Sequence, residues 1–154
     1  MMTLDMIMST DLVTLAPADT LATARSLMNE NRIHHLPVVD DGELVGLVTL
    51  TDVLAATDSY LRDPENRIHA DEIVARDIMV TDVATVDEHA SLRQAALFLE
   101  KHRIGCLPVV TEGELKGIIT DTDFVGVAIN LLEQLEMEDF GDDYDEDYDL
   151  EETA

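Results

Sequence analysis

The sequence has few of the residues that carry redox, metal and stacking chemistry. Among its 154 residues there is one cysteine and no tryptophan, and only 4% of the residues are aromatic. Because Cys106 has no second cysteine to pair with, an intrachain disulfide and a thiolate metal cluster are both excluded. Cys106 begins an apolar stretch, which favours a small core residue over a reactive thiol, since thiol activation requires nearby positive charge.

Positive charge is also scarce. Nine Lys and Arg residues stand against 34 Asp and Glu residues, which gives a net charge of −25, and Lys101 and Lys116 are the only lysines. Nucleic-acid binding and docking on anionic lipid both depend on cationic side chains, so we expect no nucleic-acid partner and no membrane partner. The acidity fits either a protein of a high-salt cytoplasm or an ordinary protein with an acidic tail.

Long apolar runs are missing. The sequence contains no run of about 18 apolar residues, which is the length that could span a bilayer. The apolar start, residues 1–8, contains Asp5 and lacks the basic region and small-residue cleavage site of a signal peptide. We therefore expect a cytoplasmic protein.

Recognisable catalytic signatures are absent as well. No nucleophile, base and orienting acid occur at usable spacing, and Gly42, Gly46, Gly113 and Gly117 are explained by hairpins instead of a phosphate loop. His34 and His35 are adjacent and would point to opposite faces of a strand, so joint metal binding is not expected. These observations predict no catalytic residue, no metal site and no enzymatic activity.

A duplication dominates what is present. Residues 7–52 recur at residues 78–123 without a gap, and 20 of the 46 aligned positions are identical. The best-preserved stretches are residues 32–39 against 103–110 and residues 46–52 against 117–123. A unit of this size is near the lower limit for a self-sufficient core, so we expect the two halves to share one core.

Each unit is expected to read strand, helix, strand, strand, helix. In the first unit, residues 12–15 alternate weakly as a strand, Thr20 is a plausible helix N-cap, and a helix follows with an apolar face. A hairpin turns at residues 40–43, and a closing helix runs over about residues 51–61. In the second unit Ser91 is the corresponding cap, and the closing helix covers about residues 122–138.

The expected organisation is a first unit over residues 1–60, a linker over 61–72, a second unit over 73–138 and an acidic tail over 139–154. The tail is too charged to fold alone, and its alternating aspartates lack the glycine of a calcium loop. The second closing helix is apolar on nearly every side. Either a homodimer covers it or it is a longer packing helix within the chain.

The duplicated motif resembles a tandem pair of CBS domains, also called a Bateman module. The resemblance covers residues 1 to about 132 and rests on two copies of Leu-Pro-Val-Val, a glycine turn and Gly-h-h-Thr-x-x-Asp, where h is apolar. It implies an α/β (α+β) fold of two pseudo-symmetric units packed through their sheets. It also implies crevices between the repeats that bind adenosyl ligands such as AMP, ADP, ATP or S-adenosylmethionine.

Two aspartates are the first candidates for that site. Asp52 and Asp123 belong to the first turn of a helix, where the dipole favours an ionised carboxylate. A carboxylate has only acceptor oxygens and therefore matches the two hydroxyls of a ribose, although each aspartate could instead simply cap its helix. Thr49 and Thr120 precede the same helices and could donate to a phosphate or merely end a strand.

The other candidates come from the resemblance, which places them along the crevice at the Leu-Pro motif: His34, His35, Leu36, Gly105, Cys106 and Leu107. The histidines could donate to anionic oxygens in a pH-dependent way, or they could be packing residues. Repeat 2 lacks these donors, so the two crevices are expected to differ. Many family members have arginine where this chain has Thr51 and Thr122. Because this chain lacks that positive charge, AMP, adenosine or S-adenosylmethionine is favoured over ATP.

The sequence thus predicts a sensor with no obligatory cofactor. An adenosyl effector would bind between the repeats and signal to an unidentified target protein through a change in shape or dimer state. The alternative is an interaction scaffold with empty pockets, whose acidic tail recruits a basic partner. A regulatory fragment of inosine monophosphate dehydrogenase, which has a similar inserted pair, is a third interpretation, but no barrel is present.

Overall fold

The computed structural model describes residues 2–62 and 72–139, with the side chains of residues 59–62 left aside. It divides into two units, Met1–Thr120 and Asp121–Ala154. Most of the expected linker and nearly all of the acidic tail lie outside the described residues. The elements are η1 (Leu4–Met6), α1 (Leu21–Asn31), β1 (His35–Asp40), β2 (Glu43–Thr49), α2 (Leu50–Arg62), α3 (Ala75–Ile78), α4 (Leu92–His102), β3 (Cys106–Thr111), β4 (Glu114–Thr120) and α5 (Asp121–Asp139).

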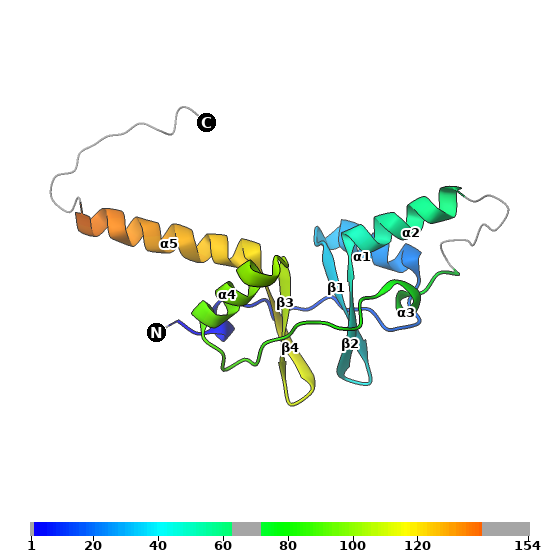
Figure 1. Ribbon diagram of the computed structural model, residues 1–154, viewed down its shortest axis with the longest axis horizontal. Coiled ribbons are helices and arrows are strands. Elements are labelled where there is room, and N and C mark those ends of the chain that lie inside the picture. The colour runs from blue at the N-terminus through cyan, green and yellow to red at the C-terminus, as the bar shows by residue number, and fades with distance from the viewer. Residues whose placement is uncertain (1, 63–71, 140–154) are drawn as a thin grey trace, which may run out of the picture. The chain divides into compact units, whose positions relative to one another are not determined.

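The first unit is built around a four-stranded sheet with strand order β1-β2-β4-β3, visible as two hairpins in Figure 1. Both hairpins are antiparallel and carry a register shift at the same place, after Val38 and after Val109. Their turns are equivalent, since Asp41 and Gly42 have φ values of 54° and 85°, and Glu112 and Gly113 have φ values of 54° and 80°. Positive φ at both central residues is the geometry of a type I′ turn, which matches the twist of the strands and confirms the expected hairpin.

The expected first strand of each repeat is reduced to a single bridge. Leu15 pairs with Val38, and its N–H donates to the Pro37 carbonyl at 2.9 Å. Val86 pairs with Val109 in the same way. Pro17 has no N–H to donate, so it cannot extend the first pairing. The segments at residues 12–15 and 83–86 each form one bridge to the sheet and are extended connections, not full strands.

The predicted helix caps are confirmed. Thr20 Oγ1 accepts the Thr23 N–H at 3.1 Å and begins α1. Ser91 Oγ accepts the Gln94 N–H at 3.0 Å, and Gln94 Oε1 accepts the Ser91 N–H at 3.0 Å. This reciprocal arrangement is a capping box, and it satisfies two backbone donors at the start of α4.

The predicted apolar faces form the core. In repeat 1, α1 buries three side chains against the sheet, which are Leu21, Ala24 and Met28. In repeat 2, α4 buries Ala95 and Leu99. The inner faces of the strands are closed by Leu36, Val38, Val48, Leu107, Val109 and Ile119, each with no exposed area.

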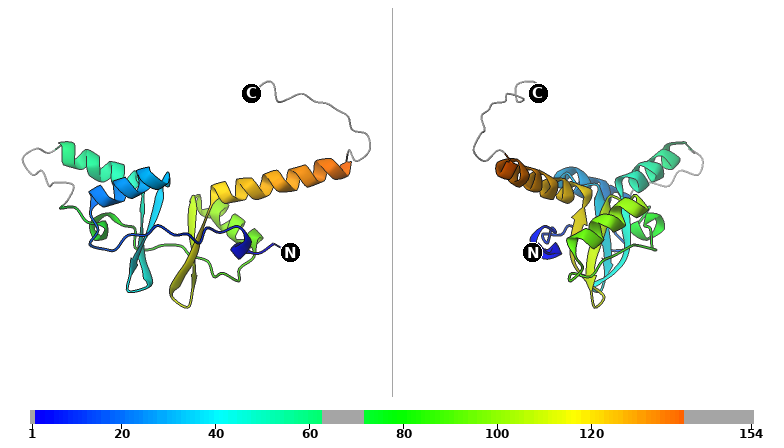
Figure 2. Two further views of the ribbon diagram at one scale, coloured as in Figure 1. Left: turned by 180° about the vertical axis from the view of Figure 1, so that it is seen from behind. Right: turned by 60° about the vertical axis from the view of Figure 1, so that its left-hand side comes forward.

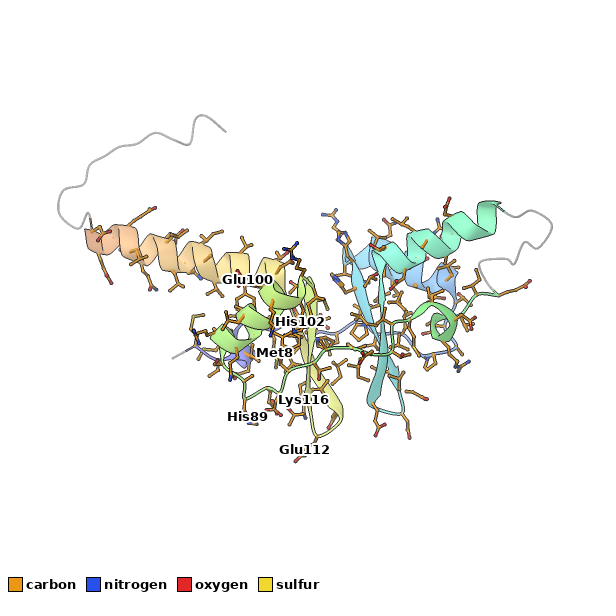
Figure 3. The ribbon with its side chains drawn as sticks, viewed as in Figure 1. Met8, His89, Glu100, His102, Glu112 and Lys116 are labelled. Carbon is orange, nitrogen blue, oxygen red and sulfur yellow. The ribbon has the colours of Figure 1, made fainter. Side chains whose placement is uncertain are left out.

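The segment that precedes each repeat is held by the hairpin of the other repeat. Ser9 forms a bridge with Ile118 on β4, and Val80 forms a bridge with Leu47 on β2. Met8 lies beside Gly117 of β4 (Figure 3), and Met79 lies beside Gly46 of β2. The two repeats are joined through these exchanged segments, and Met79 of the second segment packs against the buried cluster of repeat 1.

Direct pairing between the two hairpins is limited to one position. Strands β2 and β4 are paired at Glu43 and Glu114, which stand opposite each other. Lys116, labelled in Figure 3, has its Nζ 3.6 Å from Glu114 Oε2, and the Glu114 side chain is mostly exposed whereas that of Lys116 is 37% exposed. Like charges directly opposite each other weaken a strand pair, so the exchanged segments carry most of the connection.

The second unit contains the helix α5. The structure confirms the predicted closing helix, which extends one residue further at each end than expected. None of its side chains is classed as buried, and Leu131, Leu132 and Leu135 are each at least half exposed. Among the described residues, no helix is long and apolar enough to span a bilayer.

Candidate functional site

Asp52 stands at the corner where β2 passes into α2. Its Oδ2 accepts hydrogen bonds from the Thr49 N–H and from Thr49 Oγ1, both at 2.9 Å. In return, Thr49 Oγ1 accepts the Asp52 N–H at 3.2 Å. The two residues cap the start of α2 reciprocally, so the capping role considered in the sequence is present.

The capping bonds leave one carboxylate oxygen available. All the hydrogen bonds of the Asp52 side chain use Oδ2, and Oδ1 has no donor in the part of the chain that the structure describes. A carboxylate oxygen offers two lone pairs, so Oδ1 can accept hydroxyl donors while Oδ2 holds the corner rigid. The Thr49 hydroxyl, in contrast, has its single hydrogen committed to Asp52. A phosphate contact by Thr49 would require that bond to break.

His34 and His35 stand at the start of β1, beside the same corner. The His34 carbonyl accepts the Leu50 N–H at 2.9 Å, and its side chain is exposed. His35 is opposite Thr49 in the strand register and is half-buried. Leu36 is fully buried in the core. The structure thus brings His34, His35, Thr49 and Asp52 to one corner, while Leu36 supports that corner from below.

The repeat 2 residues have equivalent positions. Cys106 is opposite Thr120 in the strand register, as His35 is opposite Thr49. Cys106 and Leu107 are buried, which agrees with a core role for the thiol, and Gly105 directly precedes β3. Thr120 ends β4 in the first unit, and Asp123 lies in the first turn of α5 in the second.

A cavity of about 810 Å³ lies between α1 and α2. These helices run side by side in Figures 1 and 2. His34 is the one predicted site residue among its described lining residues. The other polar lining residues are Arg25, Ser26, Asn29 and Arg32. The apolar lining residues are Ala22, Met28, Ile33, Leu50, Val53 and Leu54.

Sequence reasoning did not single out Arg25, Ser26 and Asn29. A signal was present, because Arg25 and Asn29 are four residues apart and so share one face of α1, which ends directly before Arg32. The sequence does not show that α2 lies beside this face of α1, and the cavity is formed by both helices. Repeat 2 has Ala96 at the position of Arg25, so the repeats differ here too.

Among the described residues, the two side chains with shifted pKa values, Asp87 and His89, lie away from this corner. His89 Nδ1 lies 2.8 Å from Asp87 Oδ1 on the segment before α4 (Figure 3). The Asp87 carboxylate raises the pKa of His89, and the His89 backbone N–H and ring lower the pKa of Asp87. Among the described residues, no group of three His, Cys, Asp or Glu side chains is arranged to hold a metal ion.

The family follows from the repeat and the fold together. The CBS domain family model matches residues 4–59 and again residues 75–130. The chain therefore belongs to the CBS-domain family and carries two tandem copies.

Two relatives differ in how much of their length the matching segment covers. A CBS domain-containing protein of Dictyostelium discoideum is 33% identical over 132 residues, which cover 82% of this chain and 91% of that protein. Inosine-5'-monophosphate dehydrogenase of Korarchaeum cryptofilum is 36% identical over 114 residues, which cover 73% of this chain but only 21% of the enzyme. The match to the dehydrogenase is thus confined to a small part of it.

Solved structures of CBS pairs share the fold. AcuB of Vibrio cholerae aligns with a TM-score of 0.76 and 42% identity, covering 88% of this chain and 96% of that one. CBSX2, solved in complex with AMP, aligns with a TM-score of 0.72 and 29% identity, covering 84% and 97%. The CBS pair of MJ0100, solved with 5'-methylthioadenosine and S-adenosylmethionine, aligns at 0.70 with 25% identity, covering 82% and 98%. Similar CBS pairs therefore bind adenosine-containing ligands.

Proposed function

We propose that this protein is a regulatory module that binds an adenosine-containing ligand and is not itself an enzyme. The observation that carries the proposal is the Asp52 corner, where one carboxylate oxygen is fixed by Thr49 and the other is available. The AMP and S-adenosylmethionine complexes of similar CBS pairs support this class of ligand. No obligatory cofactor is needed for such a role.

Ribose recognition follows from the chemistry of Asp52. The ribose of an adenosyl ligand presents two adjacent hydroxyl donors, and an ionised carboxylate presents only acceptors. Asp52 lies in the first turn of α2, which is where a carboxylate can both cap the helix and face a ligand. Asp123 has the same place in the first turn of α5, and we propose the same role for it in repeat 2.

The charge of the chain bears on which ligand binds. A net charge of −25 opposes the approach of a polyanion, so AMP, adenosine or cationic S-adenosylmethionine is favoured over ATP. His34 is exposed at the corner and can donate to a single phosphate. Gly105 and Cys106 offer no comparable donor in repeat 2, so the two sites are expected to differ in affinity.

Signalling is proposed to pass through the association of two chains. Helix α5 carries exposed apolar side chains along its length, including Val125, Ile129 and Leu132. A second copy would bury them, and ligand binding would then alter the arrangement presented to a target protein. A ligand at 100 times its dissociation constant stabilises the bound state by about 2.7 kcal/mol, which is enough to shift such an equilibrium.

The test is calorimetry with AMP, adenosine, S-adenosylmethionine and ATP on the wild type and on Asp52→Asn. Asparagine keeps a side-chain oxygen for the Thr49 cap but places a donor where the ribose needs an acceptor. We expect affinity for the adenosyl ligand to fall at least tenfold, with the melting temperature nearly unchanged. Asp40→Asn removes the same charge from an exposed position at the end of β1 and should bind like the wild type.

The proposal is wrong if none of the four ligands binds at millimolar concentration. The ribose role alone is wrong if a ligand binds and the double variant Asp52→Asn with Asp123→Asn keeps the wild-type stoichiometry and affinity.

A further inference from the structure

We propose that the second half of α5, residues 131–139, is a docking site for a basic amphipathic helix of the target protein. This segment is the orange end of α5 in Figure 1. The class of partner follows from the apolar surface of the segment, from its charge and from the place of that charge in the helix.

The segment exposes apolar side chains outside the CBS module. Every residue of it is exposed, and Leu131 and Leu135 are 50% and 55% exposed. The two leucines are four residues apart and so share one face of the helix. The second CBS match ends at residue 130, so this face is an addition to the family module.

The charge of the segment is entirely negative. Its charged side chains are Glu133, Glu136, Glu138 and Asp139, and the whole of α5 contains no basic residue. None of these acids forms an ion pair within residues 2–62 and 72–139. Around the helix axis, Glu136 is about 100° from Leu135 in one direction and Glu138 about 60° in the other. Carboxylates therefore border the leucine face on both sides.

These acids stand where the helix itself disfavours them. The last turn of α5 contains Glu136, Glu138 and Asp139 and no basic residue. The carboxyl end of a helix carries a partial negative charge, which favours lysine or arginine there and disfavours acids. Glu133, Glu136 and Asp139 also follow one another at spacings of three, where like charges repel along the helix surface. A cationic partner would relieve both repulsions.

The face differs from the one that a second copy would cover. Val125, Ile129 and Leu132 follow one another at spacings of four and three and form one stripe, whereas Leu131 and Leu135 belong to the neighbouring stripe. Two acidic ends brought together would place like charges in one interface, which is unfavourable. A basic helix instead supplies the opposite charge beside the leucines.

The probe is a designed peptide of about 15 residues, in which leucines repeat at spacings of three and four and lysines fill the other positions. Binding of the fluorescein-labelled peptide is measured by fluorescence anisotropy without nucleotide. A scrambled peptide has the same charge but no apolar face, so it controls for general attraction to an acidic protein. We expect the amphipathic peptide to bind at least tenfold more tightly than the scrambled one, with an affinity that falls as salt is added.

One pair of variants tests the charge. Glu136→Gln with Glu138→Gln should weaken binding of the amphipathic peptide about fivefold, because two exposed ion pairs are lost. Glu30→Gln with Glu100→Gln removes the same charge from exposed positions on α1 and α4 and should leave affinity within twofold of the wild type.

A second pair tests the apolar face. Leu131→Gln with Leu135→Gln should weaken binding at least tenfold, because the buried leucine area is lost. Glutamine is a good helix former, so α5 itself should remain. The matched control, Leu54→Gln with Leu97→Gln, changes leucines that are 58% and 46% exposed on α2 and α4 and should stay within twofold of the wild type.

No binding of the amphipathic peptide, equal binding of the scrambled one, or equal losses in a variant and its control would overturn the proposal. So would a wild-type dimer that Leu131→Gln with Leu135→Gln dissociates, because a second copy would then occupy this end of α5. Since no nucleotide is present, these outcomes are independent of the calorimetry on Asp52→Asn, and the failure of either proposal is recognised separately.

Discussion

The sulfur of Met79 lies 2.5 Å from the point where a Cβ on Gly46 would be. The equivalent sulfur of Met8 lies 2.7 Å from the corresponding point on Gly117, where the Ser9 carbonyl oxygen is also close, at 2.9 Å. Each glycine thus makes room for the segment that enters the other repeat. These contacts fix the hairpins relative to one another and with them the corners that carry Thr49 and Thr120.

Replacing either glycine by alanine should destabilise the fold by about 1–3 kcal/mol, the usual cost of overpacking. Gly117→Ala should cost more than Gly46→Ala, because a backbone oxygen cannot move aside as a methionine side chain can. Urea denaturation of both variants measures the difference.

A second substitution separates the two cases. Met79→Ala should recover much of the stability lost in Gly46→Ala, whereas Met8→Ala should recover little in Gly117→Ala, since the Ser9 carbonyl remains. Equal recovery in both pairs would contradict the assigned contacts.

Thr49→Val should destabilise the protein by about 0.5–2 kcal/mol, because it removes the hydroxyl that caps α2 and bonds Asp52. Thr51→Val is the matched control, since Thr51 is exposed on the first turn of the same helix. The measurement is the free energy of unfolding of each variant in urea. Similar losses in both variants would show that the cap does not contribute to stability.

Glu43→Gln should stabilise the protein by about 0.2–1 kcal/mol at low ionic strength, because Glu43 stands opposite Glu114 where β2 meets β4. The gain should shrink in high salt, which screens exposed charges. Thermal unfolding in a salt series tests this, with Glu30→Gln on the exposed face of α1 as the control for net charge. A gain that persists in high salt would contradict the charge explanation.

The pKa of His89, followed by its ring proton shifts in NMR, should lie above the ordinary value of 6.5, because Asp87 accepts from its ring. In Asp87→Asn the pKa should fall towards 6.5. The raised pKa means that this interaction stabilises the fold fully below pH 6.5 and that its contribution is lost as pH rises through the folded-state pKa. An unchanged pKa in the variant would rule out Asp87 as the cause.

Local sequence was sufficient for the hairpins and the main helices of the fold. The Gly42 turn, the Thr20 and Ser91 caps and the spacing of Leu21, Ala24 and Met28 act over a few residues, so their patterns are visible in the chain. The bridge at Leu15 was overestimated as a strand because its neighbours alternate in polarity, while the position of Pro17 limits pairing.

Only part of the candidate site could be predicted from the sequence. A capping carboxylate and a ribose-binding carboxylate need the same residue at the same place, so the sequence could not separate the two roles of Asp52. The available Oδ1 is a property of the folded corner. The contact of Met79 with Gly46 and the cavity beside Arg25 join segments far apart in the chain, and no local pattern encodes such pairings.

The exchange of entry segments has a consequence for how the chain can be divided. If it were cut in the linker, the N-terminal half would keep the Met8 segment but lose the partner that Met79 and Val80 supply to β2. The C-terminal half would lose Ser9 from the edge of β4. Each fragment would expose strand groups that only its counterpart, or a substitute copy of itself, can satisfy. The halves should thus regain native structure when mixed, and either one alone should self-associate.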